Sequence, residues 1–499
     1  MRGPGEARLL ASGALIQQVA QAAGLIALLV IVTLLARDLT VAQLGAYGLV
    51  ASLAGYLLVL RNSVAASAVR AMAGAVNREE RADVFAAAAA LYAVVGVATG
   101  ILIALVAVGL AATVLDGELA RDARLGGIGL GALTAVGIAA SVHLDALRAE
   151  RMFPRAAGAE IAAVAIYLVL MVALIVSGTD LAVVIALSGA LPLLSGLICA
   201  GLLRRLGIAF PLVRRGAYAR HRAAILPTAG WLLVMELSNL AMYASGRIVL
   251  GAYRTPTAVG LYEGPVRAHN LLYALGGALA VPTVPTASRY ISTGDDRRLR
   301  GLALRGSRYT LALFVPLCVT LMVLAEPIIG VWLGERYTGG AGALTILVSY
   351  WLLYGALIVT PGFLAGAGEA RAAGRALAGA AVLSLVLALI LTPELGVEGP
   401  AVATAGALAT AFPLLLAAGL RVSGVSVREL LDRVAIPAYG LGAVLAGVLF
   451  GVREWLDPHA LVPVAALAVA GVGAYWAAFF ALVLDPDEQA LARSLLRRP

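Results

Sequence analysis

Apolar tracts long enough to cross a lipid bilayer as helices follow one another along this sequence. A helix rises about 1.5 Å per residue, so crossing a hydrocarbon core of about 30 Å takes roughly 20 apolar residues. Hydrophobic residues make up 62% of the 499 positions and charged residues only 13%. Lipid offers no hydrogen-bond partners, so the backbone must satisfy its own groups within each span. The chain is therefore expected to be an all-α polytopic membrane protein.

Fourteen spans are predicted, with short connections that leave no room for a sizeable soluble domain. The first seven are Leu9–Ala36, Ala42–Leu60 with an extension to Arg70 left open, Val84–Leu115, Leu125–Leu144, Ala156–Val176, Leu181–Leu203 and Ala223–Gly251. The second seven are Ala258–Ala287, Tyr309–Leu333, Ala341–Leu364, Ala372–Leu391, Ala401–Leu420, Val434–Val452 and Leu461–Leu484.

The basic residues predict the orientation of these spans. All 37 are arginine, and most fall in alternate connections, so the positive-inside rule places both termini in the cytoplasm. The net charge of +9 then indicates topology and attraction to anionic membrane lipids rather than nucleic-acid binding, because no basic soluble module is present. Cys199 and Cys318 lie within predicted spans and are expected to be packed thiols rather than a disulfide or metal site.

Two pairs of segments indicate an internal repeat. LLARDLTVAQLGAYGLV, residues 34–50, aligns with VLGAYRTPTAVGLYEGPV, residues 249–266, at an offset of 215. DALRAERMFPRAAGAEIA, residues 145–162, aligns with FLAGAGEARAAGRALAGA, residues 363–380, at an offset of 217. The predicted division is an N-terminal six-helix lobe (1–205), a cytoplasmic linker (206–222), a C-terminal six-helix lobe (223–421) and two additional helices with a cytoplasmic tail (422–499). Parallel repeats of this kind place a transporter's binding site between the halves.

Several motifs resemble those of the polysaccharide-biosynthesis or lipid-linked oligosaccharide (O-unit) flippase family, within the multidrug, oligosaccharidyl-lipid and polysaccharide exporter superfamily. They are LLARDLTVAQLGAYGLV, DALRAERMF, VGLYEGPVRAHNLL, VWLGERYTGGAGALTIL, LAGAGEARAAGRALAGA and ELGVEGPAVATAGA. The resemblance implies two six-helix lobes, related by a pseudo-twofold, around a cavity that opens alternately to each side. It implies an undecaprenyl-linked oligosaccharide as substrate, a bacterial cytoplasmic membrane as location, and glycan polymerases and other polysaccharide-assembly proteins as partners.

Polar side chains inside two neighbouring spans are the first candidates for a substrate site. Glu263, Arg267 and Asn270 sit at i, i+4 and i+7 and share one helix face. A charge at the bilayer centre costs at least roughly 2.5 kcal/mol, so this face is expected to meet a partner or a wet cavity. Two interpretations stay open: Arg267 attracts the carrier's diphosphate, or Glu263 neutralises it as a structural pair.

The preceding span carries a second stripe with Glu236, Asn239 and Arg247. Glu236 is either a coupling carboxylate or a partner of Arg267, and Arg247 either contacts substrate or extends to the outer surface.

The first two spans supply the remaining candidates. Gln17 and Gln21 lie one turn apart and either bind sugar hydroxyls or join helices. Arg61 and Arg70 line the cavity mouth if the second helix is long, and are otherwise ordinary positive-inside arginines.

Other functions are weighed against transport of a linked oligosaccharide. A peptidoglycan-precursor flippase of the same superfamily fits fourteen helices, whereas a drug or cation antiporter favours an acidic cavity. A glycan polymerase or ligase needs a substantial external loop, and the outer connections here are short. No GxxxxGK[ST], HExxH or cysteine cluster occurs, so no enzyme activity, cofactor or metal is expected.

Overall fold

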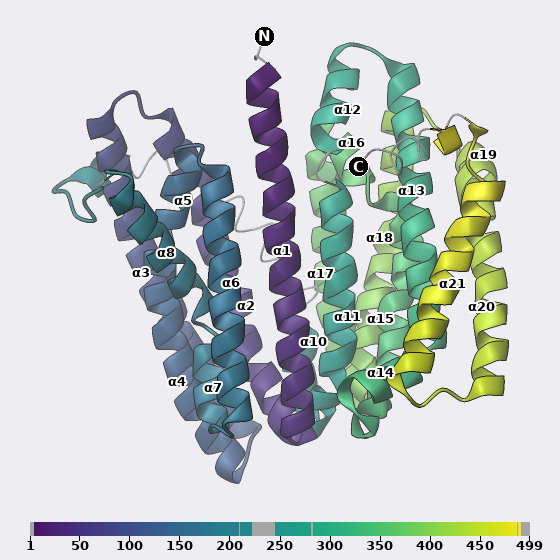
Figure 1. The fold of residues 1–499 in the computed structure, drawn as a ribbon, viewed down its shortest axis with the longest axis horizontal. Coiled ribbons are helices and arrows are strands. Elements are labelled where there is room, and N and C mark those ends of the chain that lie inside the picture. The colour runs from purple at the N-terminus through teal and green to yellow at the C-terminus, as the bar shows by residue number, and fades with distance from the viewer. Residues whose placement is uncertain (1–3, 209, 222–244, 281–282, 487, 491–499) are drawn as a thin grey trace. The chain divides into compact units, whose positions relative to one another are not determined.

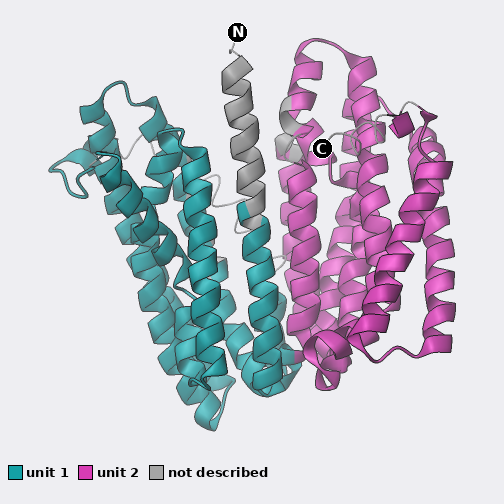
Figure 2. Ribbon diagram, viewed as in Figure 1, with its two compact units in different colours: residues 1–260 teal, residues 261–499 magenta. Residues whose placement is uncertain are grey.

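The structure is a computed structural model that describes residues 4–208, 210–221, 245–280, 283–486 and 488–490 (Figure 1). The described residues form helices joined by short connections, without a strand. They divide into two compact units, residues 1–260 and 261–499, which are considered separately (Figure 2).

Unit 1 contains nine helices and the start of a tenth in its described part. Their bounds are α1 Pro4–Asp38, α2 Val41–Gly74, α3 Arg78–Thr113, α4 Gly117–Ala140, α5 Val142–Ala149, α6 Phe153–Val176, α7 Leu181–Leu187, α8 Leu191–Arg205 and α10 Ser245–Tyr253. The boundary between the units falls within α11, Pro256–Ala280.

Local sequence signals set where these helices begin. Thr40 caps α2, because its hydroxyl accepts the Gln43 amide while the Gln43 side chain accepts the Thr40 amide at 2.9 Å. This capping box satisfies two backbone donors that the helix itself leaves without partners. Asn77 caps α3 from one side only: its side-chain oxygen accepts the Glu80 amide at 2.8 Å.

Glycines let α3 and α4 approach closely. A Cβ added to Gly100 would lie 2.4 Å from the Gly131 carbonyl oxygen, and one added to Gly131 would lie 2.4 Å from the Gly100 oxygen. Lipid supplies no hydrophobic force between helices, so close backbone packing of this kind is a main source of their association.

Unit 2 continues from α11. Its remaining helices are α12 Thr283–Ser292, α13 Asp296–Val323, α14 Ala325–Leu333, α15 Ala341–Tyr354, α16 Thr360–Gly366, α17 Ala370–Leu395, α18 Gly399–Ser423, α19 Val427–Leu430, α20 Ile436–Leu456 and α21 Leu461–Leu482. Short 3-10 turns occupy Glu335–Gly340, Gly355–Leu357 and Gly396–Glu398, and a π-turn occupies Leu431–Ala435.

Helix α13 forms the centre of unit 2, with buried Leu311, Phe314 and Val315. The last two helices pack against it: a Cβ on Gly442 of α20 would lie 2.5 Å from a Val315 methyl carbon. The Tyr475 hydroxyl of α21 donates to the Ala438 carbonyl at 3.1 Å. The final helical pair is therefore an integral part of this unit.

Eight described helices, or nine if the bent pair α7 and α8 counts as one span, are long and apolar enough to cross a membrane. One of these, Ala373–Ser423, has 51 residues and includes most of α17 and all of α18, so it has the length of two spans. The polytopic all-α membrane fold is confirmed. The count of fourteen stays a prediction, as do the domain boundaries at 205, 222 and 421, because residues 222–244 lie outside the described part.

Candidate functional site

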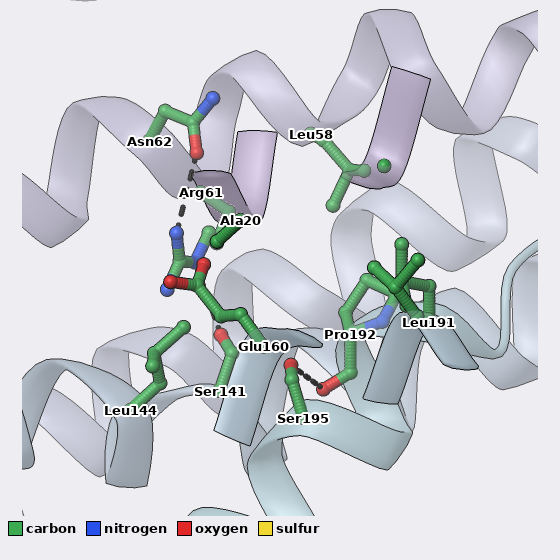
Figure 3. Close-up of a pocket in the computed structure, with 12 residues that line it drawn as sticks. Ala20, Leu58, Arg61, Asn62, Ser141, Leu144, Glu160, Leu191, Pro192 and Ser195 are labelled. Carbon is green, nitrogen blue, oxygen red and sulfur yellow. Dashed lines mark hydrogen bonds between the residues drawn. The ribbon is translucent and has the colours of Figure 1, made fainter. Parts of the chain in front are cut away.

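A cavity of about 270 Å³ lies within unit 1, among α1, α2, α5, α6 and α8 (Figure 3). Apolar and small residues form most of its wall. Its polar lining consists of Arg61, Asn62, Ser141, Glu160 and Ser195. Ionisable side chains are rare among apolar spans and mark functional sites by default, which makes this cavity the leading candidate.

Arg61 is held in the wall by contacts along its whole guanidinium group. Its Nη2 lies 2.6 Å from Oδ2 of Asp145, its Nε donates to the Ser141 hydroxyl at 3.1 Å, and its Nη1 donates to the Asn62 side chain at 3.3 Å. The Asp145 side chain is 1% exposed and that of Arg61 is 12% exposed. The Tyr92 hydroxyl also donates to Asp145 Oδ2, at 2.6 Å.

A second arginine joins Asp145 to the other acid of the cavity. Arg148 Nη1 lies 3.1 Å from Asp145 Oδ1, and Arg148 Nη2 donates to both oxygens of Glu160, at 3.0 and 3.1 Å. Glu160 lines the cavity, and its carboxylate points toward Arg61 (Figure 3). The cluster is thus continuous from α2 through α5 to α6.

The local fold explains how these side chains meet. Helix α4 ends at Ala140, and the Ser141 hydroxyl donates to the Ile138 carbonyl at 2.8 Å. Helix α5 follows directly after Ser141, and Asp145 is buried on it. Helix α2 runs on to Gly74, which carries Arg61 about 30 Å from the start of the helix at 1.5 Å per residue.

The charges of the cluster balance, since Arg61 and Arg148 face Asp145 and Glu160. Burying charges is tolerable only when each is paired and hydrogen-bonded, and Asp145 receives three donors. The cavity therefore presents donors and acceptors together rather than a bare positive field. Among the described residues no cluster of three or more His, Cys, Asp and Glu side chains is arranged to hold a metal ion.

Of the candidates predicted on the first two spans, the structure places one in the wall of this cavity. Arg61 lines the cavity, whereas Arg70, also on α2, is exposed and is not part of its lining. Gln17 and Gln21 lie on α1, but their side chains are outside what the structure describes.

The stripe on α11 forms a separate local pair. Arg267 Nη2 lies 3.1 Å from Glu263 Oε2, and the Glu263 side chain is fully buried. Asn270 is half-buried on the same helix. Arg247 on α10 is also buried, and Glu236 and Asn239 lie outside the described residues. The roles of these residues stay predictions.

His269, beside this stripe, packs among aromatic rings. Its Nδ1 lies 3.0 Å from the Tyr350 hydroxyl and accepts from Trp351 Nε1 at 3.2 Å, and both rings belong to α15. This environment belongs to the interior of unit 2.

Sequence reasoning missed Tyr92, Asp145, Arg148 and Glu160. Three of them lie within DALRAERMFPRAAGAEIA, which served as a repeat signal rather than as a source of site residues. A usable signal was present, because Asp145 and Arg148 stand at i and i+3 at the end of an apolar tract and Glu160 stands inside the next one.

Comparisons with known proteins agree with this membrane fold. A family model described as polysaccharide biosynthesis protein matches residues 34–341. The probable low-salt glycan biosynthesis flippase Agl15 of Haloferax volcanii is 25% identical over 214 residues, which cover 43% of this chain and 45% of that protein. The chain thus matches less than half the length of this curated relative.

Solved structures share the fold at low identity. The lipid II flippase MurJ, in an inward closed conformation, is 14% identical with a TM-score of 0.71, covering 97% of this chain and all of that one. An inward-facing multidrug resistance MATE family transporter of the MOP superfamily is 18% identical with a TM-score of 0.66, covering 83% of this chain and 98% of that one.

Proposed function

The chain belongs to the polysaccharide biosynthesis protein family, and on that premise we propose that it is a flippase. Its substrate is an undecaprenyl-linked oligosaccharide, which it moves across the bacterial cytoplasmic membrane by alternating access for cell-surface glycan synthesis. Both termini lie in the cytoplasm, and glycan polymerases and other assembly proteins take up the product. The described activity of Agl15 as a probable glycan flippase supports this assignment.

The observation that carries the proposal is the mixed polar wall of the unit 1 cavity. Sugar hydroxyls both donate and accept hydrogen bonds, so they are matched by a guanidinium, a carboxylate, an amide and hydroxyls on one surface. Arg61, Asn62, Glu160 and Ser195 supply that set. A site selective for a hydrophobic cation would instead be expected to contain carboxylates whose charge no arginine neutralises.

Arg61 is also the group in this cavity best suited to the carrier's diphosphate, because its forked donors match phosphate oxygens. Its contact with Asn62 is at 3.3 Å, and Asn62 is exposed. We propose that phosphate displaces the Asn62 amide from Nη1 while Asp145 keeps its hold on Nη2. Substrate then binds without unpairing the buried acid.

The α11 stripe is assigned a supporting role in the same transport cycle. Arg267 and Asn270 contact substrate, with Glu263 holding Arg267, and Glu236 is the proposed coupling carboxylate. Net transport follows the substrate gradient, the membrane potential or an ion gradient. No bond is made or broken in this proposal, so the protein acts as a transporter rather than an enzyme.

Complementation tests the proposal directly. The wild-type chain and the variants Arg61→Gln, Glu160→Gln and Asn62→Asp are expressed at matched levels in a strain that lacks its O-unit flippase, and surface glycan is measured. We expect rescue by the wild type and a loss of at least tenfold in each variant. Arg81→Gln is the matched control, because Arg81 forms an ion pair with Glu150 at 2.8 Å outside the cavity.

A parallel strain that lacks its peptidoglycan-precursor flippase separates the alternatives. Rescue of that strain alone would transfer the substrate assignment to the peptidoglycan precursor. Undiminished rescue by Arg61→Gln and Glu160→Gln would remove the cavity from the transport pathway.

A further inference from the structure

A second hollow in unit 1, of about 450 Å³, lies apart from the polar cavity and is almost entirely apolar. One wall is a row of alanines on α3 at positions 86, 89, 90 and 93, which share a helix face. The other sides are formed by Val136, Ala139 and Ala140 of α4, His143 of α5, and Leu193 and Leu197 of α8. Because alanine has a small side chain, this row leaves a trough about 10 Å long, at 1.5 Å per residue along α3.

The segment 210–221 completes the lining of this groove with both apolar and basic side chains. Leu212, Val213, Arg214 and Tyr218 line it. Val213 is 86% exposed, and two arginines, Arg214 and Arg215, follow it directly. Exposed aliphatic residues beside arginines are typical of segments that lie at the membrane interface.

The segment is fixed to the start of α3 by ion pairs that leave positive charge in excess. Arg214 Nη1 lies 2.6 Å from Asp83 Oδ1, and Arg220 Nη2 lies 2.7 Å from Asp83 Oδ2. Arg214 Nη2 also lies 3.4 Å from Glu79. Arg215, the next residue, is exposed, so the three arginines of this segment outnumber the two acids that pair with it.

We infer that this groove holds the part of one acyl chain nearest the headgroup of an anionic phospholipid, whose phosphate lies against residues 212–220. The apolar trough matches a hydrocarbon chain, and the excess of arginine at its end matches a phosphate that lacks a compensating cation. A helix of a partner protein is about 10 to 12 Å wide with its side chains. Such a helix does not fit into a groove whose volume is about 450 Å³. The bound lipid serves as a structural element of unit 1, separate from the transported molecule.

Lipid binding to the purified full-length protein tests this inference. Delipidated protein in detergent is titrated with dioleoylphosphatidylglycerol or dioleoylphosphatidylcholine, and bound lipid is counted by native mass spectrometry. We expect one phosphatidylglycerol to bind about tenfold more tightly than phosphatidylcholine. Ala90→Phe fills the trough and is expected to weaken that binding about tenfold, as the loss of roughly two buried methylenes would.

Further variants separate the effect of filling the groove from the effect of any large substitution on lipid binding. Val169→Phe enlarges an outward-facing residue of α6 that is 70% exposed and outside the groove, so it is expected to bind lipid as the wild type does. Ala93→Leu is a milder second filling of the same trough, for use if Ala90→Phe folds poorly. Arg215→Gln is expected to reduce the preference for phosphatidylglycerol over phosphatidylcholine.

Three outcomes would overturn the inference. One is wild-type binding in both groove-filling variants, and another is equal affinity for the two phospholipids. The third is displacement of phosphatidylglycerol by stoichiometric undecaprenyl phosphate, which would assign the groove to the carrier lipid. None of these results depends on whether the protein moves glycans.

Discussion

Gly45 on α2 and Gly260 on α11 occupy reciprocal positions in one helix crossing. A Cβ on Gly45 would lie 1.8 Å from the Pro256 carbonyl oxygen, and a Cβ on Gly260 would lie 2.0 Å from the Val41 carbonyl oxygen. The two glycines are separated by the same number of positions as the two carbonyls, since 260 − 45 and 256 − 41 both give 215. Reciprocal contacts of this kind are the mark of a local twofold relation, and the offset equals that of the first pair of repeated segments, residues 34–50 and 249–266.

Adding one methyl group at either glycine is expected to destabilise the protein. Gly45→Ala and Gly260→Ala each place a carbon within van der Waals overlap of a backbone oxygen, and overpacking of this kind costs about 1–3 kcal/mol. Thermal unfolding in detergent is the measurement. Gly55→Ala on the same helix is the control, because a Cβ there meets nothing within 4 Å; equal midpoints for all three variants would contradict the packing argument.

The features that could be predicted from the sequence are those that depend on neighbouring positions. The membrane fold follows from apolar run length, and the pairing of Glu263 with Arg267 follows from their i, i+4 spacing. The contact of Arg61 with Asp145 could not be predicted in this way, because the two residues are 84 positions apart. Their contact depends on the packing of α5 against α2, which apolar periodicity does not encode.

Removing the Asp145 carboxylate is expected to lower the stability of the protein far more than removing one of its hydrogen bonds. Asp145→Ala leaves Arg61 without its buried counter-charge, and breaking a buried ion pair costs about 3–5 kcal/mol. Tyr92→Phe removes one donor while both arginines remain, which costs about 1 kcal/mol. Unfolding midpoints of the two variants at matched detergent and lipid check this order. Equal midpoints for the two variants would mean that the ion pairs of Asp145 with the two arginines add no more to stability than its single hydrogen bond from Tyr92.

The α11 pair is expected to show strong coupling between its two members. Glu263→Ala leaves the Arg267 guanidinium without the carboxylate 3.1 Å away, so it should destabilise more than the double variant Glu263→Ala, Arg267→Ala, which removes both charges. Unfolding midpoints measure stability, and the complementation assay with the same variants measures transport. If stability is restored in the double variant while transport is lost, Arg267 acts on substrate. If the double variant recovers both stability and transport, the pair is structural. Losses of stability that simply add in the double variant would contradict the coupling.

A buried ion pair is expected to hold residues 485–490, which follow α21, against α13. Arg308 Nη1 on α13 lies 2.8 Å from Glu488 Oε2, and the Tyr309 hydroxyl donates to Glu488 Oε1 at 2.7 Å. The Glu488 side chain is only 9% exposed, whereas that of Asp485 is 71% exposed and its oxygen lies 3.4 Å from the same arginine. Glu488→Ala should therefore cost about 3 kcal/mol or more of stability, and Asp485→Ala less than about 1 kcal/mol. Adding Arg308→Met to Glu488→Ala should recover part of the loss, because it removes the unpaired buried charge. Limited proteolysis after α21, together with unfolding midpoints, measures both effects; equal losses for the two acids would show that the burial of Glu488 does not hold this segment in place.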